Sequence, residues 1–290
     1  MGYNWYESKM RKHLFILSTL VLFAFCFCSC NKFAGDPISK DFSIEGSYTE
    51  LQVENAFEVT VSDAVDVITV TAGENVMPNV LVEKNGNKLR IHLKALTSAY
   101  GSDLKVVIPY NADLTSVDLS GASEFHSEYG LDGQKIEVEL SGASEFYCEV
   151  YADEVDVDMS GASEFFGDID ADEIDMDLSG ASKIEGYVTA TELDIELSGA
   201  SDATLEGQVA ELEVNLSGAS NIIEKVVEHR YALICDRCEG SMSGASDAYI
   251  HCDGSIKVSL SGGSELHYTG NAATTGSDCS GGSTISHDVL

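Results

Sequence analysis

The sequence predicts an all-β protein: a right-handed parallel β-helix, a solenoid of about 19 residues per rung, preceded by an N-terminal β region. Two observations predict this fold, a short motif that returns nine times and the alternation of apolar and acidic residues before several of its copies. Successive copies start 21, 19, 19, 19, 19, 26, 18 and 19 residues apart, so each copy marks one rung. The motif is SGAS or its variant SGGS, and its copies start at Ser120, Ser141, Ser160, Ser179, Ser198, Ser217, Ser243, Ser261 and Ser280.

Residues 1–29 have the pattern of an export signal peptide. A basic run at 11–13 precedes an almost wholly apolar stretch at 14–27, which is too short to span a bilayer as a permanent helix. Met10 would begin a more ordinary signal than the first residue does, so Met10 is an alternative start. We therefore expect an exported protein.

The run FCSC that ends at Cys30 resembles the lipobox of bacterial lipoproteins, in which the cysteine after a small residue becomes lipidated. The resemblance implies lipidation at Cys30, with Cys28 as the rival position and ordinary secretory cleavage as the alternative. Residues 30–40 would then form a lipidated tether, and this anchor alone would hold the protein on a membrane. The expected location is the outer membrane, on either its periplasmic or its surface face.

Residues 41–115 form the predicted N-terminal β region. The stretches 49–73 and 79–95 contain alternating strands, and Asn85-Gly86 is typical of a hairpin turn. The run DLKVVIPY at 103–110 indicates a buried strand that leads into the first rung. Because an uncovered terminal rung is a template for edge pairing, we expect this region to cap the solenoid.

Residues 116–290 form the predicted β-helix. In EVDVDM at 154–159 and EIDMDL at 173–178, apolar residues take every second place, as in strands with one buried face. The length of a rung leaves room for three short strands. Alignment of the rungs predicts inward columns, such as Phe125, Phe146, Phe165 and Ile184, and Val155, Ile174, Leu193 and Leu212.

The SGAS motif is predicted to form the corners of the scaffold. Its glycine permits a backbone conformation closed to other residues, and its alanine is expected where the core narrows. The serine hydroxyls are expected to bond to corner backbone or to the serine of the next rung. Nine equivalent corners indicate a structural role for the motif.

The step of 26 residues contains an insertion near 221–241, expected to protrude as a loop or an extra hairpin. The insertion carries the basic residues Lys225 and Arg230, which have no counterpart in the regular repeats. Because loops on regular scaffolds often carry function, the insertion is one candidate site. Cys235 and Cys238 have the spacing of half a zinc site or of a redox pair. Buried thiols or a single local disulfide are the alternatives. We expect Cys252 and His251 to lie one rung away.

The composition narrows the choice of partners. The chain has 16 Lys and Arg against 49 Asp and Glu, a net charge of −33. This charge repels polyanions, so no nucleic acid partner and no direct docking on an anionic membrane surface are expected. The apolar share of 44% in regular alternation nevertheless indicates a folded chain.

Stacked acidic columns form the candidate binding surface. Two carboxylates about 5 Å apart in water repel by roughly 0.8 kcal/mol before screening, so such a ladder costs free energy. One hypothesis is weak Ca²⁺ binding, or binding of a cationic or sugar-like partner; the alternative is a hydrated coat that suppresses aggregation. The residues of this speculative calcium surface are Asp156, Asp158, Asp175, Asp177, Asp194 and Glu196, with Glu137 and Glu139 beneath.

No catalytic residue is predicted. A polysaccharide lyase needs basic groups that neutralise a uronate, and no repeat presents a basic cluster. The G-x-S-x-G pattern of many hydrolases is not found, and nine equivalent serines cannot each have a catalytic partner. We expect a non-enzymatic protein, with a polysaccharide lyase or hydrolase as an alternative.

The lipobox, the segments at 48–62, 87–93 and 106–110, and the serial LSGAS copies together resemble the head GIN domain family of auto-transporter adhesins, over residues 41–290. The resemblance implies a β-helix preceded by extra β structure. It also implies a cell-envelope lipoprotein that adheres to, or binds, a glycan or another envelope or surface component. A purely structural envelope protein is the alternative, and any oligomeric state is compatible with the sequence.

Overall fold

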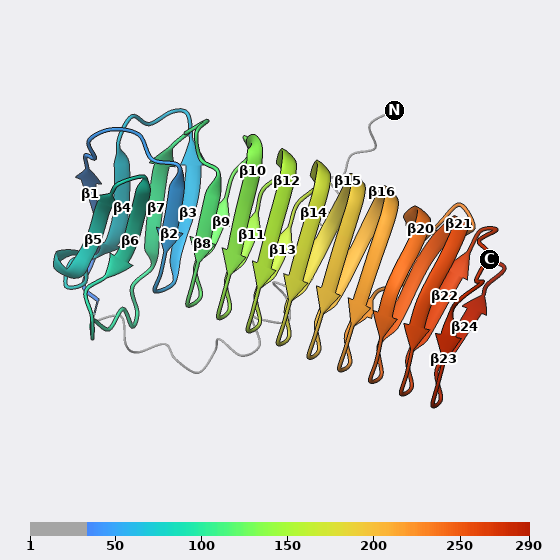
Figure 1. Ribbon diagram of the computed structural model, residues 1–290. Helices are drawn as coiled ribbons and strands as arrows, with labels where there is room; N and C mark the ends of the chain where they lie inside the picture. Colours follow the sequence, from blue (N-terminus) through green and yellow to red (C-terminus); the bar gives the residue numbers. More distant parts are fainter. Residues whose placement is uncertain (1–33) are drawn as a thin grey trace.

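The structure, a computed structural model, describes residues 34–290, which fold into one continuous stack of strands (Figure 1). The N-terminal β region lies at one end of this stack and the last strands lie at the other. The expected signal peptide and the lipidation site at Cys30 lie outside the described residues and stay predictions. Within residues 34–290, no helix is both long and apolar enough to cross a membrane.

The solenoid repeats one arrangement, in which a short strand follows each motif and a longer strand precedes the next. Neighbouring rungs pair in parallel and keep one register from β8 to β20, which confirms the predicted all-β solenoid. The strands are β8 (Ser116–Leu119), β9 (Glu124–His126), β10 (Leu131–Leu140), β11 (Glu145–Tyr147), β12 (Val150–Met159), β13 (Glu164–Phe166), β14 (Ile169–Leu178), β15 (Lys183–Leu197), β16 (Asp202–Leu216), β17 (Asn221–Ile222), β20 (Leu233–Met242), β21 (Asp247–Leu260), β22 (Glu265–Thr269), β23 (Asp278–Cys279) and β24 (Thr284–His287).

The expectation of three separate short strands per rung was wrong. Two of them run together in the ten-residue strands, as in β12, and only Asp153 interrupts the pairing within it. In β15 and β16 all three merge into one strand of 15 residues. A rung therefore bends without ending its strand, because a single unpaired residue is enough to turn the chain.

The N-terminal β region extends the solenoid as well as covering it. Its β2 and β3 pair in parallel with β8 and β9, so they form a further rung that lacks the motif. Beyond this rung, β4 pairs antiparallel with β1 and β7. The elements are β1 (Pro37–Phe42), β2 (Glu50–Val53), β3 (Phe57–Ser62), β4 (Ile68–Gly73), the 3-10 turn η2 (Met77–Asn79), β5 (Val80–Asn85), β6 (Lys88–Leu93) and β7 (Leu104–Pro109).

The hairpin predicted at Asn85-Gly86 is confirmed. Strands β5 and β6 are antiparallel, and Asn85 faces Lys88 across the turn. Gly86 has a φ of 61°, which glycine adopts without a steric penalty. This hairpin and the β1–β4 pair place antiparallel strands at the N-terminal end of the stack, where a bare parallel rung would otherwise be open to edge pairing.

The core is a set of straight columns along the rod axis. The predicted columns are confirmed, because Phe125, Phe146 and Phe165 face one another from rung to rung and all are fully buried. Their rings stack with centroid distances of 5.4 and 4.8 Å. Each buried phenylalanine contributes about 1.5–3 kcal/mol by removal of apolar surface from water. Further along, the column continues through Ile184 and Ala203.

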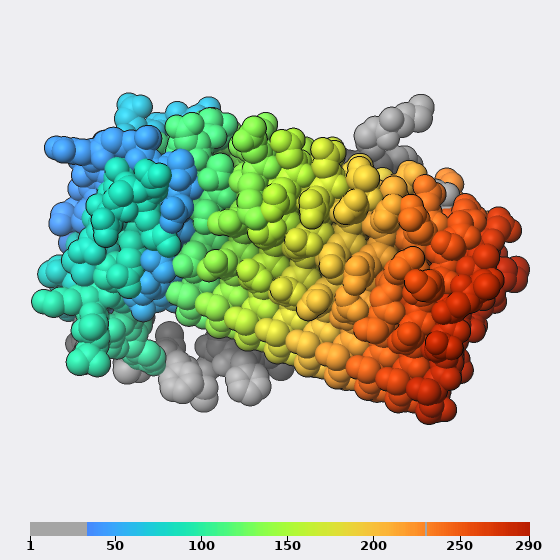
Figure 2. All heavy atoms as spheres, in the orientation of Figure 1, coloured from blue at the N-terminus to red at the C-terminus, as the bar shows by residue number. Residues whose placement is uncertain are grey.

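The corners of the motif depend on glycine for two separate reasons. Gly142, Gly161 and Gly180 have φ values of 79°, 81° and 79°, in the left-handed region. A Cβ built on Gly161 would also lie 2.4 Å from the carbonyl oxygen of Gly142 in the preceding rung. The corners therefore stack closely, and they form a regular row along the lower edge of the rod (Figure 2).

The expected place of the alanine in the motif was wrong. Ala143 and Ala162 are exposed, whereas the second serines, Ser144 and Ser163, are fully buried. The hydroxyl of Ser144 donates to the carbonyl oxygen of Ser141 over 2.8 Å, as predicted for the corner backbone. Because this bond satisfies the hydroxyl inside the core, the serine turns inward and the alanine is left at the tip of the turn.

The insertion forms the predicted hairpin. Strands β18 (Val226–Val227) and β19 (Arg230–Tyr231) pair antiparallel and leave the solenoid after Ile222. Residues 233–241, which we assigned to the insertion, instead belong to the regular strand β20. The protruding part is therefore shorter than predicted, and the two cysteines of the CxxC pair belong to the scaffold.

Candidate functional site

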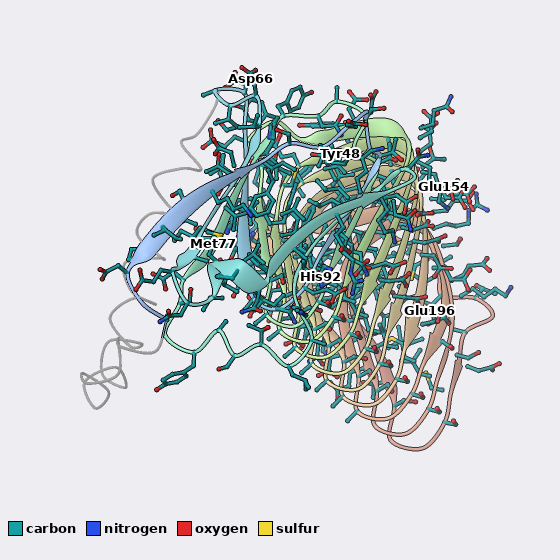
Figure 3. All side chains as sticks on the ribbon, turned by 90° about the vertical axis from the view of Figure 1, so that its left-hand side faces the viewer. Tyr48, Asp66, Met77, His92, Glu154 and Glu196 are labelled. Carbon is teal, nitrogen blue, oxygen red and sulfur yellow. The ribbon has the colours of Figure 1, made fainter. Side chains whose placement is uncertain are left out.

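The acidic columns lie on one outward face of the long strands. Strand alternation turns the residues between core positions outward, and the parallel register sets them one above another. Seen along the rod, Glu154 and Glu196 project from the same side (Figure 3). We call two of these columns the acidic ladder; its residues are Glu137, Asp156, Asp175, Asp194 and Glu213, and Asp118, Glu139, Asp158, Asp177 and Glu196.

A long groove runs beside the second column of this ladder. Its volume is about 710 Å³ and it crosses seven rungs, from Asp118 to Ser241. The carboxylates of the second column and the first serines of the motifs line it together. We call it the serine–acid groove; its polar lining residues are Asp118, Glu139, Asp158, Asp177, Glu196, Asn215, Ser241, Ser141, Ser160, Ser179, Ser198, Ser217 and Ser243.

Burial and repulsion by neighbouring carboxylates raise the pKa of Asp158, Asp175, Asp177 and Asp194 in the ladder. For Asp158, burial is the main cause, followed by the charges of Asp177 and Asp156. The largest shift is at Asp194, where burial, and after it the charge of Glu213, raises the pKa from 3.8 to about 6. Its Oδ1 atom is buried without a hydrogen-bond partner. The charged ladder therefore destabilises the fold, and neutral polar residues at the same positions would not.

The six residues of the speculative calcium surface lie side by side but do not converge. Asp156, Asp175 and Asp194 follow one another in the first column, and Asp158, Asp177 and Glu196 follow in the second. Across residues 34–290, no three or more His, Cys, Asp or Glu side chains are grouped so that they could hold a metal ion. The geometry therefore offers a row of carboxylates and not a preformed cage.

Basic residues flank the acidic face at both ends. At the N-terminal end, Lys135 contacts Glu154 at 2.5 Å and Asp156 at 2.6 Å. Towards the C-terminal end, Arg237 contacts Glu211 at 2.5 Å. The uncompensated negative charge is therefore concentrated on the rungs between these two cations.

Lys225 of the insertion does not form a separate site, and the side chain of Arg230 lies outside the described part of the chain. Lys225 makes an ion pair with Glu206 on β16. At the end of the hairpin, the Tyr231 hydroxyl donates to Asp288 Oδ2 over 2.6 Å, and His267 Nδ1 lies 2.9 Å from the same oxygen. These contacts attach the hairpin to the last rungs. The polar groups of the hairpin therefore hold it on the solenoid.

The cysteine pair points into the core. Cys235 and Cys238 are both buried, and Cys252 faces Cys235 from the next rung, with His251 beside it, as predicted. No further ligand joins them among the described residues, so the half zinc site is not completed. All the cysteines in residues 34–290 are free thiols: Cys148, Cys235, Cys238, Cys252 and Cys279.

A group of exposed tyrosines near the N-terminal end was not predicted. The rings of Tyr110 and Tyr129 lie 5.0 Å apart, and the Tyr129 hydroxyl donates to Asp63 Oδ1. A cavity of about 420 Å³ next to them is lined in part by Phe42, Tyr48 and Tyr110. These residues lie in irregular corners outside the repeat, so alignment of the rungs gave no signal. The signal that could have indicated this group is the presence of aromatic residues in a sequence whose surface positions are otherwise mostly acidic.

Comparison with protein families identifies one match. The model of the family described as "Putative auto-transporter adhesin, head GIN domain" matches residues 47–187 and 164–272. Together these segments cover more than half of the chain. No curated protein matches the sequence significantly.

Solved structures from two species of Parabacteroides have a similar fold. A "putative adhesin" from Parabacteroides distasonis has a TM-score of 0.64 at 18% identity, over 88% of this chain and 98% of that one. A "putative adhesin" from Parabacteroides merdae has a TM-score of 0.59 at 16% identity, over 88% and 97%. A "putative lipid binding protein" from Parabacteroides distasonis has a TM-score of 0.60 at 17% identity, over 88% and 97%. At these identities the likeness concerns the fold alone.

Proposed function

The chain belongs to the family described as "Putative auto-transporter adhesin, head GIN domain", and on this premise we propose that it is a non-enzymatic cell-envelope protein that binds glycans. The serine–acid groove is the observation that carries the proposal. Lipidation at Cys30 would hold the protein on the outer membrane, with the rod displayed beyond the tether. The family description supports an adhesive role at the envelope.

The shape of the groove favours an extended polymer. It crosses seven rungs, and rungs about 4.8 Å apart give it a length of roughly 30 Å. Each rung presents one carboxylate, amide or hydroxyl from a long strand and, on most rungs, one hydroxyl from a motif. A chain of repeated sugar units can make the same contacts at each rung. A short ligand would contact only one or two rungs.

The charge of the groove selects among glycans. Carboxylates accept hydrogen bonds from sugar hydroxyls and are strong acceptors for ammonium groups. Uronate and sulfated polymers would face the repulsion of Glu139, Asp158 and Asp177. We therefore propose a neutral or amino-sugar glycan as the ligand, with the exposed Tyr110 and Tyr129 as an apolar stacking surface near one end of the rod.

Divalent cations are a second part of this proposal. The ladder residues Asp156, Asp175 and Asp194 follow one another at rung spacing, and Ca²⁺ prefers carboxylate oxygens. Because the side chains do not converge, we expect weak association spread over the ladder. Such ions would lower the repulsion between carboxylates and could bridge to sugar hydroxyls.

The bonding of the motif serines supports a role without catalysis. The buried Ser163 hydroxyl donates to the carbonyl oxygen of Ser160 over 3.0 Å. The first serines also reach backbone carbonyls, as Ser179 does at Met159 over 3.3 Å. A nucleophile needs a base as its hydrogen-bond partner, and these hydroxyls bond to carbonyl groups instead.

Three other functions compete with glycan binding. A purely structural envelope protein would use the same rod without a ligand, and a polysaccharide lyase or hydrolase would cleave the polymer in the groove. Lipid binding, named for one of the similar structures, would need an apolar cavity for acyl chains. The serine–acid groove is lined mostly by carboxylates and hydroxyls, which does not favour an acyl chain.

A glycan array tests the proposal. The detergent-solubilised full chain is applied to neutral, amino-sugar, uronate and sulfated glycans, and we expect binding to the first two classes only. The double variant Asp158→Asn, Asp177→Asn removes two carboxylates from the groove and should weaken binding at least 10-fold.

Asp170→Asn is the matched control, because Asp170 is exposed on β14 outside the groove. It should bind as the unaltered protein does. Failure to bind any glycan would favour the structural alternative, release of cut products would favour the enzymatic one, and preference for uronates would contradict the proposed charge selection.

A further inference from the structure

The cysteines of two adjacent rungs face each other in the core. Cys235 lies on β20 and Cys252 on β21, and the two are direct partners in the parallel register. Both side chains are buried, with 1% and 0% exposure. Parallel strands about 4.8 Å apart place such partners within the 4.4–6.8 Å range of Cα distances that disulfides span.

Cys252 Sγ lies among backbone polar groups. It is 3.5 Å from the carbonyl oxygen of Asp236 and 3.6 Å from that of Ser255. The adjacent Cys235 thiol lowers the pKa of Cys252, and the N–H groups of Gly254 and Ser255 add to this effect. Cys252 is therefore the thiol of the pair that ionises first.

The other cysteines do not offer a comparable pairing. Cys238 faces Ile256, and it lies three residues from Cys235 on the same strand, about 10 Å away if that strand is extended. This separation exceeds the reach of a disulfide. Cys279 is exposed and faces Leu260, and Cys148 lies rungs away, between β11 and β12.

We propose that Cys235 and Cys252 form a disulfide bond between two rungs once the exported chain meets an oxidising compartment. The oxidant is the reactive disulfide of a thiol–disulfide exchange protein or of a small-molecule disulfide. The Cys252 thiolate attacks one sulfur of that disulfide and displaces the other as a thiolate. The Cys235 thiolate then attacks Cys252 Sγ, and the second oxidant sulfur leaves. Two protein protons and two electrons end on the two oxidant sulfurs.

The cross-link would lie where the regular stack is interrupted. After β17 the chain leaves the solenoid to form the β18–β19 hairpin, and it returns at Leu233, two residues before Cys235. The pairing of β20 with β21 also slips between Cys235 and Arg237. A bond from Cys235 to the next rung would therefore fix the returning strand next to both irregularities.

Peptide mapping of the natural protein tests this proposal. The full chain is exported by a Gram-negative host, isolated from its membranes and alkylated in denaturant without reductant. We expect alkylation of Cys148, Cys238 and Cys279, and a joined pair of peptides containing Cys235 and Cys252, lighter than their sum by two hydrogen atoms. Trypsin cleaves after Arg237 and so separates Cys235 from Cys238 and Cys252. Cleavage at Glu239 or Asp247 then separates Cys238 from Cys252.

Single variants identify the partners. In Cys235→Ser, Cys252 should become alkylated, whereas Cys238→Ser should keep the cross-link. Reductant should lower the Tm of the unaltered protein by about 5 °C and should leave that of Cys235→Ser nearly unchanged. Alkylation of both Cys235 and Cys252 in the isolated protein, or linkage of either one to Cys238, would overturn the proposal, and this result needs no variant to fold.

Discussion

The row of motif corners and the acidic ladder run along the same rungs but respond to repetition in opposite ways. At the corners, stacking is favourable, since each buried serine bonds within its own turn and each glycine leaves room for the next carbonyl. In the ladder, stacking places like charges about one rung apart, and the pKa of Asp194 rises to about 6 as a result of burial and of its neighbours' charges.

The contrast shows which part of the repeat serves the fold. Substitution of neutral polar residues for Asp156 or Asp175 would keep the alternation that buries the core and would remove repulsion of roughly 0.8 kcal/mol per pair before screening. The scaffold therefore requires the corners but not the charges. Local departures from the most stable choice are expected where a protein binds something, which is why we place the function on the ladder and its groove.

The largest expected effect comes from breaking the corner row. Gly161→Ala places a Cβ 2.4 Å from the carbonyl oxygen of Gly142 and forces alanine to a φ of 81°. The left-handed conformation and the clash together should lower the free energy of unfolding by about 2–4 kcal/mol. Denaturant unfolding measures this, and Ala162→Gly, at the exposed tip of the same turn, should change stability by less than about 1 kcal/mol. Equal effects of the two would refute the steric account of the corner.

A smaller effect should come from relieving the ladder at Asp194. Its pKa of about 6 in the folded state exceeds the usual 3.8, so the folded protein binds this proton more tightly than the unfolded chain does. The ionised side chain therefore destabilises the fold above pH 6, and this penalty disappears as the pH falls towards 4. Asp194→Asn should raise the free energy of unfolding at pH 7 by about 1 kcal/mol or less, after allowance for its partial exposure.

The pH dependence of this difference is the decisive part of the test. Urea unfolding of the two proteins should differ most at pH 7 and should converge near pH 4, where Asp194 is protonated and resembles asparagine. The matched variant Asp170→Asn changes an exposed carboxylate on the same strand as Asp175 and should give no such trend. A difference that stays constant with pH would mean that charge repulsion is not its cause.

The smallest effect should come from adding calcium. If Ca²⁺ associates with the ladder, it should raise the Tm by about 1–2 °C beyond NaCl of the same ionic strength, because bridging adds to screening. The double variant Asp175→Asn, Asp177→Asn should lose this excess and keep the response to NaCl. Equal responses of the unaltered protein to both salts, with no heat in a calorimetric titration, would leave screening as the whole effect.

The solenoid and the ladder were predictable because their contacts join residues one period apart. Alignment on the motif alone placed Phe125 beside Phe146 and Asp156 beside Asp175, and the register confirms both. Cys252 was expected one rung away from the CxxC pair, and it faces Cys235, although a shift of register next to Cys235 sets this exact pairing. In a repeat protein the sequence spacing is itself the contact map.

Features outside the period were not predictable in this way. In the rung formed by β2 and β3, Asn55 and Ala56 take φ values of 70° and 67° next to Gly121, so they turn the chain without the motif. The Tyr110–Tyr129 pair joins an irregular corner to the end of β7. Neither feature repeats, so no alignment of rungs could reveal it.

The sequence by itself determined the all-β solenoid, its register, its inward columns and the stacked carboxylates, because each follows from a spacing of about 19 residues and an alternation of two. Only the tertiary structure decided that the second serine of the motif is buried and the alanine exposed, and that the carboxylates and the first serines together line a groove. It also decided that the N-terminal strands continue the stack. These features depend on backbone rotation at single turns, which sets the direction of a side chain and leaves no trace in the spacing of residues.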